Sequence, residues 1–383
     1  MTLAESDFAR LTLWRQHLHA MPEVSGEERE TAAEVVRFLT EQASPDEIIT
    51  GLGGTGVAAV FQGADAGPTI MFRAELDALP IAELSSDLPY RSQIAGKGHM
   101  CGHDGHMATL AALAVSFSKN RPAFGRVILL FQPAEENGAG AAAVMADEKF
   151  ENLMPDYTFS LHNMPGIPFG KSWIRAGAAN CASCGLKISF TGKTAHASMP
   201  ETGVSPAPAV AALIPALTDL RKGDIRDGDL VLATVTHVSV GEPAFGIAPG
   251  SAELWVTLRT VNDDAMADVR EKAEALATQA AKAHGLSVSF SYHDEFRHCM
   301  NDADAVEIIR AALDAENLPH EAGETFRASE DFGRFADVSK SAMFFLGAGE
   351  NHPALHNPTY DFPDQLIPIG ARIFKRIADD LLG

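Results

Sequence analysis

The chain has 383 residues, more than one ordinary domain requires, so two domains are expected. Acidic residues outnumber basic ones by 51 to 30, and the resulting formal charge of −21 argues against nucleic acid or an anionic membrane as a partner. No apolar run approaches the roughly 18 residues of a membrane span, and the N-terminus lacks an apolar signal core, so a cytoplasmic protein is expected.

The first part of the chain has the pattern of an α/β domain. Its expected elements are helices over 6–20 and 27–42, strands over 57–61 and 69–72, a helix over 104–118, a strand over 127–131, a helix over 138–149 and a strand over 157–161. Ser6 is the expected N-cap of the first helix. Continuous apolar strands that alternate with helices predict a mixed, mostly parallel sheet with helices on both faces.

The pattern changes after about residue 176. The next expected elements are a strand over 186–190, a helix over 206–220, strands over 231–240 and 252–259, a helix over 265–284 and a strand over 286–292. Two helices and four alternating strands are typical of a small inserted α+β domain. The first pattern then resumes, with helices over 303–316, 329–335 and 367–382 and a strand over 342–346. The predicted domains are therefore 1–178 and 295–383, forming one domain in two parts, and an insert at 179–294.

Two of the four cysteines, Cys181 and Cys184, have the two-residue gap of a zinc knuckle or a redox pair. No second Cys or His pair follows at the spacing of a zinc knuckle, and the pair does not open a helix after a strand. The sequence therefore predicts two buried thiols here.

The stretch Met100–Met107, with the sequence MCGHDGHM, places Cys101 and His103 one residue apart. Thiolate and imidazole are the usual ligands of a borderline-soft divalent ion, and carboxylates complete or orient such sites. The alternative is a buried thiol beside histidines at the start of a helix.

Further polar groups follow the predicted strands. Asp77 comes after the strand over 69–72, Glu135 and Glu136 follow that over 127–131, and His162 follows that over 157–161. His356 lies in a loop after the strand over 342–346. Each has a structural alternative, such as a solvated loop or a histidine bonded to backbone. Together they predict a metal site, because the carboxyl ends of strands in open α/β sheets meet at one edge.

The adjacent glutamates suit hydrolysis. One carboxylate can serve as a ligand, while the other remains free to take a proton from the attacking water. The number of candidate ligands exceeds what one tetrahedral ion needs, so two ions are expected, with Cys101 soft enough to bridge them.

These residues lie in motifs that resemble the di-metal aminoacylase and carboxypeptidase-G type metallopeptidases, in particular their amidohydrolase branch. The matching segments, in chain order, are RAELDALPI (73–81), GHMCGHDGH (98–106), FQPAEE (131–136), LHNMP (161–165), GKTAHASMP (192–200), SEDF (329–332), FLGAG (345–349) and LHNPTYDF (355–362). The branch includes hippurate hydrolases, N-acyl-amino-acid amidohydrolases and plant auxin–amino acid conjugate hydrolases.

The resemblance implies a role for each candidate residue. Metal ligands would be Cys101, His103, Glu136, His162 and His356, binding two divalent ions per subunit (manganese, zinc, cobalt or nickel). Glu135 would be the general base and Asp77 an orienting carboxylate. His196, in the insert, would polarise the scissile carbonyl. The implied fold is a zinc-peptidase-like catalytic domain interrupted by a ferredoxin-like lid and dimerisation domain, in a homodimer or dimer-based oligomer.

Two positions depart from the family pattern. Glu75 stands where the branch usually has Asp, and Gly246 stands where relatives usually carry an Asn that helps to hold the substrate. Arg259 occupies the place of a carboxylate-binding arginine, although a solvated strand residue is the alternative.

The favoured function is a metal-dependent amidohydrolase that cleaves the amide bond of an N-acyl amino acid or a similar small N-acyl amine. A di-metal dipeptidase or carboxypeptidase that uses the same site is the alternative within enzymes. A metal-binding protein without catalysis is the alternative outside them. Such a protein would be expected to have lost Glu135 or a ligand, and all of these are present.

Overall fold

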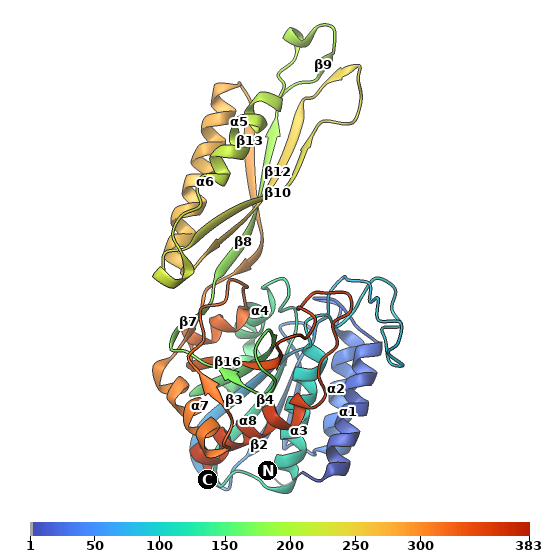
Figure 1. Cartoon of the computed structure of the whole chain (residues 1–383), viewed down its shortest axis with the longest axis vertical. Helices are drawn as coiled ribbons and strands as arrows, with labels where there is room; N and C mark the ends of the chain where they lie inside the picture. The colour runs from blue at the N-terminus through green and yellow to red at the C-terminus, as the bar shows by residue number, and fades with distance from the viewer. Residues whose placement is uncertain (1–2) are drawn as a thin grey trace. The chain divides into compact units, whose positions relative to one another are not determined.

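The computed structural model describes residues 3–383, which fall into two compact units (Figure 1). The first unit contains the chain up to Ala179, together with Cys299–Glu324 and Asp331–Gly383. The second contains Asn180–His298 and the short segment Thr325–Glu330. No helix within residues 3–383 combines the length and the apolar character needed to cross a bilayer.

The first unit is built on an eight-stranded mixed sheet. In spatial order its strands are β1 (Glu47–Leu52), β2 (Gly56–Gln62), β4 (Phe124–Gln132), β3 (Asp65–Glu75), β5 (Tyr157–Pro165), β16 (Lys340–Gly349), β6 (Ser172–Trp173) and β15 (His320–Glu321). The four central strands β4, β3, β5 and β16 are parallel to one another. Strands β5 and β16 are buried except at their ends, and β3 and β4 are buried over their C-terminal halves, as expected of parallel strands covered on both faces.

Helices cover both faces of this sheet. One face packs against α1 (Glu5–Ala20), α2 (Arg29–Gln42), α3 (His103–Lys119), α7 (Ala303–Ala315) and α8 (Leu366–Leu382). The other packs against α4 (Gly140–Ala146) and the 3-10 helices η1 (Glu148–Leu153) and η4 (Asp331–Asp337). Helix α3 is buried over most of its length because α1 and α8 pack against it above the sheet. The predicted α/β fold class is confirmed.

Several predicted boundaries were wrong. Strand β5 continues through His162 to Pro165, because buried partners satisfy the imidazole inside the sheet. Ser6 lies within α1, whose N-cap is Ala4. The helix predicted over 138–149 divides into α4 and η1 at Asp147, whose extended backbone interrupts the helix. The segment predicted as a helix over 329–335 forms the 3-10 helix η4.

The second unit has a four-stranded antiparallel sheet with two helices on one face (Figure 1). Its strands, in spatial order, are β10 (Val231–Val240), β12 (Ser251–Thr260), β8 (Ala182–Thr191) and β13 (Ser287–Phe296), and its helices are α5 (Ala207–Thr218) and α6 (Asp263–Ala283). The chain order β8, α5, β10, β12, α6, β13 is that of a ferredoxin-like fold. A small ribbon pairs β9 (Ala195–His196) with β11 (Ile247–Ala248).

The short segment Thr325–Glu330 belongs to the second unit because its backbone bonds to that unit. Cys181 donates its backbone N–H to the carbonyls of Phe326 and Ala328, and Arg259 reaches the carbonyl of Arg327. The main part of the unit also ends at His298, where the sequence predicted residue 294, since a bulge after His293 lets β13 run to Phe296.

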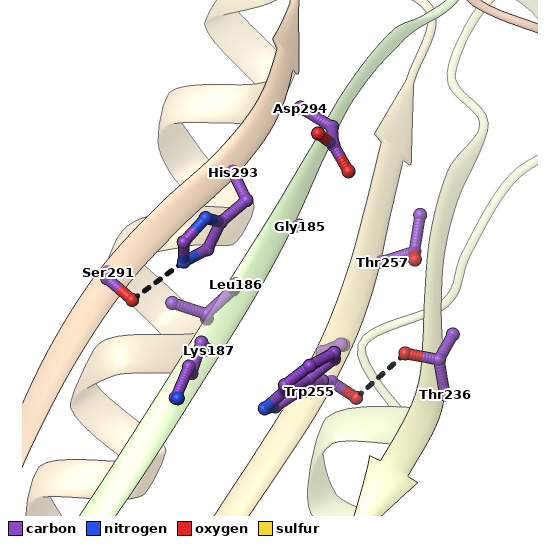
Figure 2. Close-up of a pocket in the computed structure, with 10 residues that line it drawn as sticks. Gly185, Leu186, Lys187, Thr236, Trp255, Thr257, Ser291, His293 and Asp294 are labelled. Carbon is purple, nitrogen blue, oxygen red and sulfur yellow. Dashed lines mark hydrogen bonds between the residues drawn. The ribbon is translucent and has the colours of Figure 1, made fainter. Parts of the chain in front are cut away.

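The face of this sheet opposite α5 and α6 is hollowed at Gly185 (Figure 2). A cavity of about 540 Å³ opens there, lined on its sides by Lys187, Trp255 and His293. Two of the polar side chains around it have partners, since Lys187 pairs with Glu253 and the His293 ring contacts Ser291. The smaller strands β7 (Gly177–Asn180) and β14 (Cys299–Asn301) pair with each other where the chain passes from one unit to the other.

Candidate metal centre

Polar side chains of the first unit gather at the carboxyl edge of its parallel strands. Asp77 follows the end of β3, Glu135 and Glu136 follow β4, and His162 lies near the end of β5. Cys101 and His103 lie at the start of α3, and His356 lies in the loop between β16 and α8. All but Glu136 and His356 are buried.

Their ligand atoms form overlapping groups. Atoms within 4.8 Å of one another come from Cys101, His103 and His162 in one group, and from Cys101, Glu136 and His356 in another. Cys101 belongs to both. A further group joins His103 to Glu135 and Glu136. The structure thus brings all five predicted ligands together, with the predicted base beside them.

Two of the imidazoles are oriented by backbone carbonyls. His103 donates Nδ1–H to the carbonyl oxygen of Asp77 at 2.8 Å, and His162 donates Nδ1–H to that of Asn163 at 2.7 Å. Each ring therefore turns its Nε2 toward the cluster, where His162 Nε2 lies 3.5 Å from Cys101 Sγ. A backbone partner that fixes the other ring nitrogen is the usual arrangement of a metal-binding histidine.

Asp77 is fully buried behind this cluster. Its Oδ2 accepts hydrogen bonds from Ser25 Oγ at 2.7 Å and from the backbone N–H of Glu136 at 2.9 Å. Its backbone carbonyl holds the His103 ring. Asp77, just past the end of β3, therefore links the loop of Glu135 and Glu136 to the start of α3.

Two non-glycine residues beside the cluster have left-handed backbones, Ala134 with φ 50° and His356 with φ 64°. This conformation costs about 1–2 kcal/mol for a residue with a Cβ, so the surrounding structure must hold it in place. The Ala134 N–H donates to Glu28 Oε1, and the His356 N–H donates to the Met100 carbonyl, both at 2.8 Å. These bonds turn Glu135 and His356 toward the same edge.

Burial and like charge dominate the electrostatics of the cluster. Burial raises the pKa of the Cys101 thiol well above its ordinary value, and Glu136 and Glu135 raise it further. Burial also lowers the pKa of His162 to about 3, with the charge of His106 acting in the same direction. Burial alone would lower the pKa of His103, but Asp77, whose Oδ1 lies 3.6 Å from Nδ1, and Glu75 outweigh it and raise the pKa to about 10.

These residues fit a divalent cation. His103 Nε2 is buried and has no hydrogen-bond partner within residues 3–383. A thiol and several carboxylates crowd around it, and a bound cation would relieve the repulsion between the carboxylates and favour the thiolate. Thiolate, imidazole and carboxylate together suit a transition metal or zinc better than magnesium or calcium.

A buried network behind the cluster was not anticipated as part of the site. Glu75 Oε2 lies 2.6 Å from His106 Nδ1, and both residues form a group of candidate ligands with His103. Arg73 contacts Glu75 and, at 2.6 Å, Asp331 at the start of η4. A charged residue inside an apolar strand was the available signal for Arg73, whereas its pairing with Asp331 has no signal in the sequence.

The other two predicted residues, His196 and Arg259, lie in the second unit. His196 is exposed, and its Nδ1 accepts the backbone N–H of Ser198 at 3.1 Å, so the neutral ring carries its proton on Nε2. Arg259 lies on β12 and is half-buried. Its Nη1 donates to the Arg327 carbonyl and to Ser329 Oγ, both at 2.9 Å.

Comparison with known proteins identifies the family. The sequence profile of peptidase family M20/M25/M40 matches residues 71–380. The chain belongs to the M20 family. Among curated M20-like relatives, a hippurate hydrolase from Campylobacter jejuni is 32% identical over 369 residues, covering 95% of this chain and 94% of the relative. An N-acetyl-L-cysteine deacetylase from Bacillus subtilis is 31% identical over 357 residues, covering 92% of this chain and 83% of the relative.

A solved structure from Bacillus subtilis, described as a dinuclear metal-binding peptidase of the M20 family, superposes with a TM-score of 0.82. The two chains are 26% identical, and the match covers 99% of each. The predicted resemblance and the prediction of a hydrolase that acts on amide bonds are therefore confirmed. Cys181 and Cys184 are free, buried thiols, as predicted.

Proposed function

We propose that this M20 protein hydrolyses the amide bond of an N-acyl amino acid or a similar small N-acyl amine. The observation that carries the proposal is the shared position of Cys101 in two ligand groups, with Glu135 in a third group beside them. The hippurate hydrolase and the N-acetylcysteine deacetylase among its relatives support this substrate class.

Two divalent ions per subunit would be held by Cys101, His103, Glu136, His162 and His356, of which Cys101 belongs to both ligand groups. Manganese, zinc, cobalt and nickel all suit this ligand set. Bound there, such ions polarise a substrate carbonyl and lower the pKa of water.

Glu135 would act as the general base. It is 5% exposed and directly precedes the ligand Glu136, so its carboxylate can face the substrate while its neighbour holds metal. It takes one proton from the attacking water and delivers it to the amide nitrogen as the C–N bond breaks. The products are a carboxylic acid and a free amine, and the acid then gives up its proton to the amine or to water. Asp77 keeps the His103 ring and the Glu136 backbone in place during this exchange.

His196 would donate a hydrogen bond from Nε2 to the carbonyl oxygen as negative charge develops on it. The bond from Ser198 N–H to Nδ1 supports this role, because it leaves Nε2 as the donor. Arg259 would bind the substrate carboxylate, and Gly246 in place of Asn would alter which amino acid is accepted. We also propose that the protein forms a homodimer or a dimer-based oligomer.

A substrate screen tests the reaction class. The purified chain is reconstituted separately with manganese, zinc, cobalt or nickel and assayed with acetyl, benzoyl and indole-acetyl amino acids, with dipeptides in parallel. Hydrolysis of N-acyl amino acids is expected. Hydrolysis of dipeptides alone would favour the peptidase alternative, and protein that binds metal but cleaves neither class would indicate a non-catalytic role.

A further inference from the structure

A buried guanidinium on the N-terminal helix contacts carboxylates from two separate segments that carry candidate metal ligands. Arg15, on α1, is completely buried. Its Nη1 donates to Asp104 Oδ2 at 3.2 Å and to Asp361 Oδ1 at 2.7 Å, and its Nε donates to Asp364 Oδ1 at 2.8 Å. The Tyr90 ring lies against the guanidinium, 4.8 Å from Cζ.

The first of these carboxylates belongs to the segment that holds Cys101 and His103. Asp104 directly follows His103 in the first turn of α3, and its Oδ1 accepts the N–H of Gly105. Its other oxygen contacts Arg15 and, at 2.9 Å, His19 Nδ1 from the next turn of α1. The position of the first turn of α3 therefore depends on its contacts with α1.

The other two carboxylates belong to the segment that holds His356. Asp361 and Asp364 lie between His356 and α8, and Tyr90 Oη donates to the second oxygen of Asp361 at 2.7 Å. The bond from His356 N–H to the Met100 carbonyl is a direct backbone link between the two segments. Arg15, which is buried, adds a second link between the two segments through Asp104 and Asp361.

We propose that Arg15 is a positioning residue that sets the spacing between Cys101 and His103 on one segment and His356 on the other. The proposal rests on the proposed metal-dependent function, because it concerns how these ligands are held. Arginine suits this task since its planar fork can bind several carboxylates in fixed directions, whereas a lysine ammonium is a single compact charge.

The geometry predicts an uneven effect on the two ions. His356 is half-exposed and has a left-handed backbone, and its backbone N–H is held by the Met100 carbonyl. His103 and His162 are held independently by backbone carbonyls. Loss of the Arg15 contacts should therefore weaken the ion of the Cys101, Glu136 and His356 group more than the ion of the Cys101, His103 and His162 group.

Two variants test this with the full-length protein. Arg15→Lys keeps the charge but loses the fork, and Asp361→Asn removes the charged link to the His356 segment while keeping its shape. Cobalt(II) titration of metal-free protein, followed by thiolate-to-cobalt absorption and by calorimetry, gives the number of ions and the affinity of each. We expect one of two affinities to fall by about tenfold, at the lower end of the effect of removing an outer partner of a ligand.

Asp7→Asn is the matched control. Asp7 is also a buried carboxylate on α1 and also contacts α3, but it pairs with Lys119 at the far end of that helix, at 2.6 Å. This variant should lower the melting temperature while both cobalt affinities stay unchanged. If Asp7→Asn weakens cobalt binding as much as Asp361→Asn, Arg15 serves general stability and the inference is wrong.

The inference is also overturned if folded Arg15→Lys, or Asp361→Asn, binds both ions like the wild type. Should Arg15→Lys fail to fold, Asp361→Asn decides the outcome. Wild-type protein that binds fewer than two ions would contradict the proposed metal centre instead. The two failures are thus distinguishable.

Discussion

Glu135 and Glu136 are neighbours in the chain with different surroundings, and their proposed roles differ accordingly. Glu136 joins Cys101 and His356 in a ligand group, whereas Glu135 lies beside His103 and Glu136. We expect Glu135→Gln to retain bound metal and to lose about 10²–10⁴-fold in turnover, the usual contribution of a proton shuttle. Glu136→Gln should instead weaken metal binding. Metal analysis and kcat measurement separate the two effects.

The control for this pair is Glu151→Gln, an exposed glutamate of η1 that should leave both quantities unchanged. The opposite pattern, in which Glu135→Gln loses metal and Glu136→Gln loses only turnover, would exchange the two roles. It would leave the reaction class untouched.

Cys101 is the one cysteine whose thiol belongs to ligand groups within residues 3–383. Cys101→Ala should therefore lose at least one ion, and chelation of the wild-type protein should abolish hydrolysis, with recovery when metal is restored. Cys184→Ala, which removes a buried thiol in the second unit, should keep the full metal content. Metal analysis by mass spectrometry measures each case. Fully active protein without a bound divalent ion would refute the proposed centre.

At the scale of elements, the contact between α1 and α3 makes stability depend on pH. Burial lowers the pKa of His19, but its bonds with Asp104 and Glu83 outweigh burial and raise the pKa to about 9, above the ordinary 6.5. The folded state therefore favours the protonated ring. The contribution of the protonated His19 ring to the free energy of unfolding is fully present below pH 6.5 and is lost as the pH rises through 9.

The free energy of unfolding of the wild type should exceed that of His19→Gln by a larger amount at pH 6 than at pH 9.5. The change should be on the order of 3 kcal/mol at most, from about 1.4 kcal/mol for each unit of pKa. Urea unfolding of metal-free protein measures this difference at the two pH values. An equal difference at both would show that His19 is not charged in the folded protein.

Gly105 lies inside α3 despite the low helix propensity of glycine, because the Phe362 ring packs against its backbone. A Cβ added at Gly105 would lie 2.2 Å from Cγ of the Phe362 ring. Gly105→Ala would gain about 1 kcal/mol in helix propensity, but the overpacking typically costs about 1–3 kcal/mol. We expect a net loss of stability, measured by urea unfolding, and a partial recovery in the double variant with Phe362→Leu. A more stable single variant would show that the ring moves aside freely.

Most of the fold was predictable from the sequence, because periodicity reports burial, and the motifs indicated which candidate side chains gather at one edge of the sheet. The continuous apolar runs correctly predicted the parallel strands β4 and β5. The charged networks were not predictable. Arg15 meets Asp361 and Arg73 meets Asp331 across hundreds of residues, and periodicity does not indicate which charged side chains pair in the core. The end of β5 was missed for a related reason, since a buried histidine looks like a loop residue in the sequence.

At the scale of the whole molecule, the chain leaves the first unit at Asn180 and returns at Cys299, with a further excursion over Thr325–Glu330. The proposed metal ligands lie before and after the insert along the chain, whereas His196 and Arg259 lie within it. The first unit must therefore assemble from distant parts before the centre exists. The proposed role of His196 would also bring a residue of the second unit to the centre.

We predict that this second unit belongs to the partner subunit of a homodimer, so that each active site uses His196 of the other chain. His196→Ala and Glu135→Gln homodimers should each be nearly inactive, since loss of one donor to a developing oxyanion typically costs ~10²–10³-fold in turnover. A hybrid dimer would contain one site with both groups intact. After equal mixing and subunit exchange, activity should rise to about one quarter of the wild-type value, because half of the dimers are hybrids and each has one intact site of two. Mixing followed by size-exclusion chromatography and an activity assay measures this. Exchange of differently tagged subunits, verified by pull-down, without recovery would show that His196 acts within its own chain or takes no part in the reaction.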